Sequence, residues 1–322
     1  MDRGFPRLLG DIGGTNARWA WQATAGEPPQ CIASYRCDEF GSISETIARY
    51  RADHDLPDPA QVAFGIATAV TEDTVRMTNR AWTFSIRALR ESLGVTRCLV
   101  LNDFEALATA LPALRPESVR QVGRGQAVPG PPMAVLGPGT GLGVAGLVWS
   151  GANRSVTIAG EGGHVTLAAS TQREAAVLAR LQRRFGHVSA ERAVCGPGLV
   201  HLYEALGEID ARRVERLGPS EVTDRALHAS DPACVEALAM FASFLGSVAG
   251  NLALTLGARG GVYLGGGIVP RLGTAFDALP FRERFVDKGR FRTYLEDIPT
   301  HVITDPAIGL LGAARALDAL TD

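Results

Sequence analysis

The chain has 322 residues, which is long for one compact core and comfortable for two lobes. The 32 basic residues against 34 acidic ones leave no positive excess of the kind that predicts nucleic-acid binding. Five cysteines, with no CxxC pair and no Cys/His cluster, argue against a zinc site and against a disulfide framework. The first residues enter a predicted strand with no apolar signal region, so we expect a cytoplasmic protein that is not bound to a membrane.

In chain order, the first part predicts strands and helices in alternation. Expected strands lie at 8–12, 17–22, 31–36, 61–67 and 97–103, and expected helices at 42–52 and 104–114. Residues 116–132 are rich in glycine, proline and charge, which indicates a surface connection.

The second part repeats the alternation. Strands are expected at 133–137, 144–150, 155–159 and around 262–264, and helices at 171–186, after residue 198, at 237–258 and at 305–320. Residues 237–258 carry no charge and could span a bilayer by length, but glycine, serine, asparagine and threonine dilute their apolarity. We therefore predict a buried core helix there. Strands that alternate with helices predict an α/β fold.

Two segments, 8–22 and 135–149, share one plan: an apolar strand, a glycine-rich turn with a threonine, and a second strand. This repeated pattern predicts a duplicated domain. Neither loop has the lysine of a P-loop, and the residues after the first loop alternate with period two, which indicates a strand and not the helix of a dinucleotide site. Glycine brings backbone N–H groups close to an anion, so two matched loops would suit a triphosphate. Either loop alone is equally well interpreted as a plain hairpin turn.

Several motifs occur together in the order found in bacterial glucokinases. They are GDIGGTNAR (10–18), LNDFEA (101–106), GPGTGLG (137–143), GEGGHV (160–165), SAER (189–192), CGPG (195–198) and GGVYLGGGIVPR (260–271). The chain resembles this family from residue 8 to the C-terminal helix. The resemblance implies the two-lobed, actin-like ATPase (ribonuclease H-like) fold of the hexokinase-type sugar kinases, with the active site in the interlobe cleft. It implies a small α/β domain of residues 1–110 plus 305–322 and a large one of residues 111–304. The chain lacks the cysteine-rich zinc motif of related sugar kinases, which favours the non-zinc branch.

Asp103 is the candidate catalytic base. It follows a predicted apolar strand, where side chains project into a cleft, and phosphoryl transfer to a sugar hydroxyl needs a carboxylate that accepts the proton. Residues 102–105 also fit an N-terminal helix cap, and from the residues alone the cap is the better interpretation. The resemblance favours the base, with Asn102 binding the sugar and also capping the helix.

Three further side chains are candidate glucose ligands. Glu161 can accept hydrogen bonds from two vicinal hydroxyls, and His164 can donate from one ring nitrogen and accept at the other. A glycine turn with an exposed glutamate and a satisfied histidine is the alternative. Glu191 is a sugar contact by resemblance alone; by position it is a polar residue at a helix start, after Ser189.

The ATP-binding residues implied by the resemblance lie in three glycine-rich turns. They are Gly10, Asp11, Ile12, Gly13, Gly14, Thr15 and Asn16 in the first, Gly139, Thr140 and Gly141 in the second, and Gly265, Gly266 and Gly267 in an adenosine-binding turn. Asp11 resembles the aspartate that holds Mg²⁺ through water, because hard cations take oxygen ligands. Three glycines alone specify no ligand, so the third turn is also explained by a strand-to-helix connection.

Together with the resemblance, these residues predict an ATP-dependent glucokinase that phosphorylates the 6-hydroxyl of glucose, with Mg²⁺ as cofactor. The resemblance also implies a homodimer. Alternatives are a related hexose or N-acetylhexosamine kinase, a kinase that uses polyphosphate, or a sugar-free ATPase of the same fold. A sugar-responsive transcription regulator would need a DNA-reading module, which the six residues before the first strand do not provide.

Overall fold

The computed structural model describes residues 4–77, 81–151 and 154–320. The chain divides into two compact units. Unit 1 comprises Met1–Leu114 with Asp305–Asp322, and unit 2 comprises Arg115–Thr304. Each unit is an α/β fold built on its own sheet.

The sheet of unit 1 has five strands. In spatial order they are β3 (Gln30–Arg36), β2 (Asn16–Gln22), β1 (Arg7–Ile12), β4 (Gln61–Ile66) and β7 (Arg97–Asn102). Antiparallel pairing joins β1, β2 and β3, whereas β1, β4 and β7 run parallel. The first hairpin is therefore the β1–β2 turn that the period-two pattern predicts. A separate two-stranded sheet pairs β5 (Thr74–Arg76) with β6 (Thr83–Ser85).

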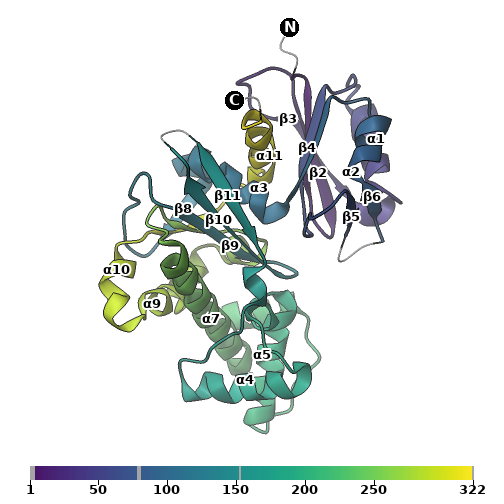
Figure 1. The fold of residues 1–322 in the computed structure, drawn as a ribbon. Coiled ribbons are helices and arrows are strands. Elements are labelled where there is room, and N and C mark those ends of the chain that lie inside the picture. Colours follow the sequence, from purple (N-terminus) through teal and green to yellow (C-terminus); the bar gives the residue numbers. More distant parts are fainter. Residues whose placement is uncertain (1–3, 78–80, 152–153, 321–322) are drawn as a thin grey trace. The chain divides into compact units, whose positions relative to one another are not determined.

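Helices cover both faces of this sheet (Figure 1). They are α1 (Ile43–Asp53) and α2 (Ile86–Ser92) on one face, and α3 (Asp103–Ala110) and α11 (Ile308–Asp318) on the other. Neighbouring strand residues point to opposite faces, so Leu8 packs with the α1 side and Leu9 with α11, both fully buried. The C-terminal segment thus completes the core of the N-terminal unit.

The sheet of unit 2 has the same order with one strand added. It runs β11 (Ser155–Gly160), β10 (Leu142–Trp149), β9 (Met133–Pro138), β12 (Val262–Leu264), β13 (Thr300–Ile303) and β8 (Val119–Val122). The strands from β11 to β13 repeat the pairing directions of unit 1. This repeat confirms the duplication predicted from the two hairpins.

Some elements differ from the sequence expectations. The connection expected at 116–132 contains the short strand β8, which pairs antiparallel with β13. The sequence pattern predicts neither strand, because each has only four residues and little apolar alternation. Their pairing joins residues about 180 positions apart, which no local pattern reveals.

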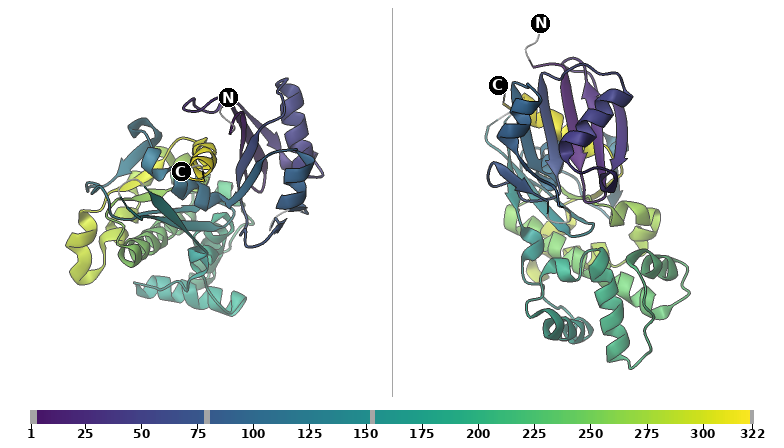
Figure 2. Two further views of the ribbon diagram at one scale, coloured as in Figure 1. Left: turned by 45° about the horizontal axis from the view of Figure 1, so that its top comes forward. Right: turned by 90° about the vertical axis from the view of Figure 1, so that its right-hand side faces the viewer.

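Several helices pack together in unit 2 besides its sheet (Figure 2). Its helices are α4 (Gln172–Phe185), α5 (Gly196–Ile209), α6 (Pro219–Leu227), α7 (Pro232–Leu256), α8 (Ile268–Leu272), α9 (Phe281–Val286) and α10 (Arg292–Glu296). Single turns of 3-10 helix lie at Gly162–His164 and Ala190–Arg192.

The apolar helix α7 is the centre of this unit. It is the one described helix long and apolar enough to cross a membrane, and 78% of its most apolar window is buried inside the structure. A Cβ on Gly246 would lie 2.3 Å from the Phe281 carbonyl oxygen, so glycine allows α9 to pack directly on the α7 backbone. The helix is therefore a core helix, as predicted.

Candidate active site

The first candidate phosphate turn lies at the end of the β1–β2 hairpin in unit 1. The Gly13 N–H donates to the Asn16 carbonyl at 2.9 Å, and the Cys37 N–H donates to the Thr15 carbonyl at 2.9 Å. Thr15 and Asn16 are exposed, whereas Ile12 is fully buried. Ile12 therefore has no exposed atom to offer a ligand, and its carbonyl accepts from the Ala67 N–H. The partly or fully exposed groups of the turn belong to residues 13–16.

Asp11 lies directly opposite Arg18 in the hairpin register. Its carboxylate is 3.7 Å from the Arg18 guanidinium and keeps 32% of its surface exposed. Arg18 also donates to the Ser34 hydroxyl and to the Pro306 carbonyl. Burial raises the pKa of the Asp11 carboxyl, and the neighbouring Arg18 charge acts in the opposite direction. A Cβ on Gly309 would lie 3.0 Å from Asp11 Cγ, so the start of α11 closes over this carboxylate.

Asn102 and Asp103 occupy the junction between β7 and α3. The Asn102 side-chain oxygen accepts from the N–H groups of Phe104 at 2.9 Å and Glu105 at 3.3 Å, and its amide donates to the Thr68 carbonyl. Asn102 is therefore the helix cap, as the sequence allowed. Asp103 is the first residue of the helix, half-exposed, and its Oδ1 accepts from the Phe104 N–H at 2.9 Å.

The second candidate phosphate turn, residues 139–141, joins β9 to β10 in unit 2, and we call it the donor loop. The Gly139 N–H donates to the Gly141 carbonyl at 2.8 Å, and the Gly139 carbonyl accepts from the Gly196 N–H at the start of α5 at 2.9 Å. Thr140 is exposed at the tip. Backbone bonds therefore fix the shape of the loop and leave the Thr140 side chain at the surface.

The predicted sugar ligands of unit 2 lie beside this loop. Glu161 precedes one 3-10 turn and His164 ends it. The Glu161 carboxylate lies 3.9 Å from the His164 Nε2, and both side chains are more than half exposed. Glu191 lies on the other 3-10 turn, and its Oε2 accepts from the Leu142 N–H at 2.8 Å. The Ala190 N–H bonds the Val165 carbonyl at 2.9 Å, which holds the two turns together.

The third glycine turn follows β12 and packs on the end of β9. A Cβ on Gly137 would lie 2.4 Å from the Gly265 carbonyl carbon. Gly266 has φ +74°, and a Cβ there would lie 2.5 Å from the Pro138 carbonyl oxygen. Gly265 is buried, whereas Gly266 and Gly267 are exposed. Close backbone packing thus explains the glycines at 137, 265 and 266 without a ligand, and an adenosine-binding role for this turn stays a prediction.

Comparisons with known proteins decide the family. Residues 8–320 match the family model of glucokinase. A glucokinase of Aromatoleum aromaticum is 53% identical over 315 residues, which cover 98% of this chain and 95% of that protein. The chain belongs to the glucokinase family.

Solved structures agree with this assignment. The crystal structure of a glucokinase from an Antarctic psychrotroph superposes with a TM-score of 0.87 and 34% identity, covering 97% of this chain and 98% of that one. A ROK-family glucokinase from Streptomyces griseus, solved with glucose and AMPPNP, has a TM-score of 0.65 at 18% identity, covering 97% and 99% of the two chains. The glucokinase-family fold, an actin-like α/β architecture, and membership among the kinases are therefore established, as the motifs predicted.

The donor atoms beside the first glycine turn decide whether Mg²⁺ would fit there. In the described ranges no group of three His, Cys, Asp or Glu residues could hold a metal ion. Mg²⁺ bound with a nucleotide usually takes one or two carboxylates besides phosphates and water. The partly exposed Asp11 carboxylate meets that requirement, so the donor set fits.

Two contacts of this glucokinase-family chain have no counterpart among the sequence predictions. Arg18 contacts Asp11, and the Leu142 amide binds Glu191. The first could have been found from the hairpin register, since a short turn places residues 11 and 18 opposite each other. The second joins strand β10 to a turn about 50 residues later and leaves no local signal.

Proposed function

We propose that this chain transfers the γ-phosphoryl group of ATP to the 6-hydroxyl of glucose, with Asp103 as the general base. The observation that carries the proposal is the division of roles at the start of α3. Asn102 accepts from the N–H groups of both Phe104 and Glu105, so the cap does not depend on the further bond that Asp103 accepts from Phe104. The positive end of the helix dipole favours a negative charge on the first residue, which suits a proton acceptor.

The sugar ligands are assigned by their chemistry. Asn102 and Asp103 in unit 1, and Glu161, His164 and Glu191 in unit 2, offer carboxylate, amide and imidazole groups to the glucose hydroxyls. The exposure of Glu161 and His164 leaves both side chains open to a ligand. Asp103 orients the 6-hydroxyl and takes its proton as the new bond to phosphorus forms.

The nucleotide is assigned to the glycine turns. Backbone N–H groups of the first turn and of the donor loop bind phosphate oxygens, apart from those of Gly13 and Gly139, which donate within their own turns. The turn at 265–267 receives the adenosine. The AMPPNP complex of the Streptomyces relative supports ATP as the donor. Asp11 would hold Mg²⁺ through water, and the ion would neutralise charge on the transferring phosphates. We further propose that the enzyme acts as a cytoplasmic homodimer.

The decisive experiment is the Asp103→Asn substitution, assayed by coupled ADP release with glucose and other hexoses. Asparagine keeps the shape and hydrogen bonds of aspartate but cannot take the proton. The kcat should fall by about 10²–10⁴-fold, the usual contribution of a general base, while glucose binding measured by calorimetry changes less.

Asp231→Asn is the matched control. Asp231 caps α7, with its Oδ1 accepting from the Ala233 N–H at 2.9 Å, and asparagine caps equally well. This variant should keep wild-type kcat and melting temperature. An Asp103→Asn enzyme that is stable, binds glucose and turns over within about threefold of wild type would refute the role of Asp103 as base. A tenfold change in rate corresponds to ~1.4 kcal/mol of activation free energy, so a threefold change is too small for the loss of a proton acceptor.

A further inference from the structure

The peptide of Leu142 is the point where the donor loop contacts the sugar motifs of unit 2. Its N–H donates to Glu191 Oε2 at 2.8 Å. Its carbonyl oxygen lies 2.1 Å from where a Cβ on Gly163 would stand, so the Gly162–His164 turn packs on that carbonyl and tolerates no side chain there. The first residue of β10 is thus held on both sides by segments that carry predicted glucose ligands.

Glu191 also limits the donor loop itself. A Cβ on Gly141 would lie 2.4 Å from Glu191 Oε2, so the carboxylate lies directly against the loop backbone. A hydrogen bond between a carboxylate and a backbone N–H is one of the stronger kinds in proteins. This contact fixes the end of the loop that follows Thr140.

We propose that Glu191 is a positioning residue that couples sugar binding to nucleotide binding in unit 2. One carboxylate oxygen holds the donor loop through the Leu142 amide, while the carboxylate also binds a glucose hydroxyl. Bound glucose holds the Glu191 side chain in place, and Glu191 in turn holds the donor loop. Because coupling between two binding sites is reciprocal, a nucleotide bound to the loop raises the affinity for glucose by the same factor. The inference rests on the proposed function for the assignment of glucose to Glu191 and of phosphates to the donor loop.

The first test measures glucose binding by calorimetry without nucleotide. The φ of Gly141 lies outside the left-handed region, so alanine fits the backbone there, but its Cβ must displace the Glu191 carboxylate. We expect Gly141→Ala to weaken glucose binding by about tenfold or more, as expected when hydrogen bonds to a charged group are lost. Gly139→Ala, in the same loop with no atom within 4 Å of its Cβ, should bind glucose as wild type does. Equal glucose affinities in the two variants would overturn the proposal.

The second test measures AMPPNP binding in the presence of Mg²⁺ without sugar. If Glu191 only contacts sugar, then Glu191→Ala removes a negative charge near the phosphates, and nucleotide binding should be unchanged or stronger. If Glu191 positions the loop, AMPPNP should bind about fivefold to tenfold more weakly to Glu191→Ala, the usual effect of losing one hydrogen bond to a charged group. Glu191→Gln keeps an oxygen that can accept from the Leu142 N–H, so it should restore AMPPNP binding while glucose binding stays weak.

Wild-type AMPPNP affinity in Glu191→Ala would overturn the positioning role. Thermal unfolding of each variant shows whether it is folded. If Gly141→Ala does not fold, the AMPPNP affinities of Glu191→Ala and Glu191→Gln decide the question. The proposed function fails by a different result, namely a wild-type chain that releases no ADP with glucose in the coupled assay. The AMPPNP comparison needs no glucose, so it still decides whether Glu191 positions the loop.

Discussion

Single residues show most clearly why adjacent polar groups are hard to assign from sequence. Asn102 and Asp103 both suit a helix start. The structure confirms the predicted cap at Asn102, which accepts from the N–H groups of Phe104 and Glu105, and it shows that Asp103 Oδ1 also accepts from Phe104. The same holds for Glu191, which by position is a polar residue at a helix start but in the fold binds the amide of Leu142. The role of each side chain follows from which backbone groups lie within reach.

His301 on β13 provides a residue-scale prediction for pH dependence. Its ring stacks on Tyr263, with centroids 5.1 Å apart, and its Nδ1 has no hydrogen-bond partner within the described part of the chain. Burial lowers the pKa of His301 below its ordinary 6.5. As the pH falls, His301 therefore binds a proton in the unfolded chain before it does so in the folded one. The stability that the neutral His301 contributes is present above about pH 6.5 and is lost as the pH falls below it.

The His301→Phe variant tests this sign. Its free energy of unfolding should depend less on pH between about 7 and 5, by at most ~1.4 kcal/mol per pH unit, which is the effect of one proton. Denaturant unfolding at several pH values gives the slope. Tyr263→Phe keeps the stacked pair and should retain the wild-type slope, whereas a wild-type slope in His301→Phe would contradict the prediction.

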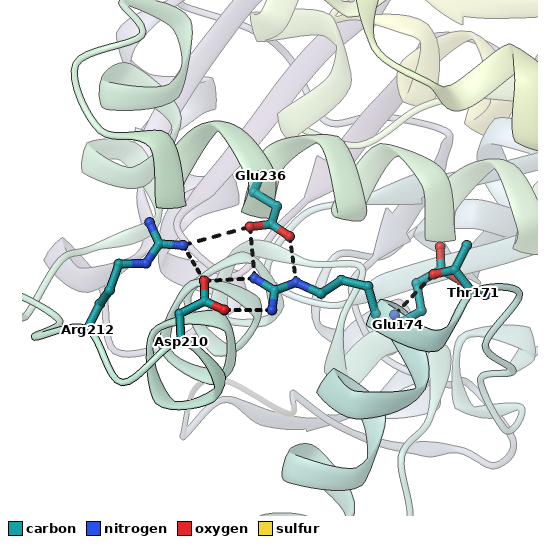
Figure 3. A network of polar contacts seen from close by, with 6 residues as sticks. Thr171, Glu174, Asp210, Arg212 and Glu236 are labelled. Atoms are coloured by element: carbon teal, nitrogen blue, oxygen red, sulfur yellow. Dashed lines mark hydrogen bonds and ion pairs between the residues drawn. The ribbon is translucent and has the colours of Figure 1, made fainter.

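At the scale of elements, an ion-pair network joins three helices of unit 2 (Figure 3). Arg173 on α4 donates to both oxygens of Asp210, at 2.7 and 2.8 Å, and to both oxygens of Glu236 on α7, at 2.7 and 3.0 Å. Asp210 caps the end of α5, and Arg212 contacts both carboxylates. A planar guanidinium that bridges two carboxylates loses less entropy than separate surface pairs and contributes more to stability.

We expect Arg173→Met to lower the melting temperature by roughly 2–4 °C, which corresponds to about 1 kcal/mol. Methionine keeps an apolar side chain but leaves Asp210 and Glu236 without this shared cation. Arg292→Met is the control, because it removes an exposed pair within α10, Arg292 Nε to Glu296 Oε1 at 3.0 Å. That variant should change the melting temperature by less than about 1 °C, and equal effects in both would show that the network adds nothing.

The network also has a predictable response to acid. Hydrogen bonds from Arg173 and then Arg212 hold the pKa of Asp210 below its ordinary 3.8. A lowered carboxyl pKa contributes stability above the ordinary value and loses it as the pH falls further. The difference between Arg173→Met and wild type in denaturant unfolding should therefore shrink below about pH 4.

At the scale of the whole molecule, the chain leaves unit 1 and returns to it at residue 305. The returning helix α11 buries one face of the sheet of unit 1, where Leu9 and Ala63 pack with Leu310 and Leu317 and are fully excluded from solvent. Unit 1 is therefore completed by residues far from it in sequence, whereas unit 2 is continuous.

Leu310→Ala tests whether the stability of unit 1 depends on that return. Removing a fully buried leucine side chain should cost about 2–5 kcal/mol. Hydrogen exchange followed by mass spectrometry should show lost protection in β1, β4 and α3, while α5 and α7 keep theirs. Leu202→Ala, at a fully buried position of α5, should give the reverse pattern. Loss of protection across both units in either variant would contradict separate units.

The sequence by itself determined the family, the α/β class, the two hairpins and the core helix α7. Period-two alternation, glycine turns and a long apolar run are local signals, because neighbouring residues set them. The tertiary structure decided the pairing of β8 with β13 and the contact of the Leu142 amide with the Glu191 carboxylate. Each of these joins segments that are distant in sequence or opposite in a sheet, and such contacts depend on the folded chain bringing the partners together.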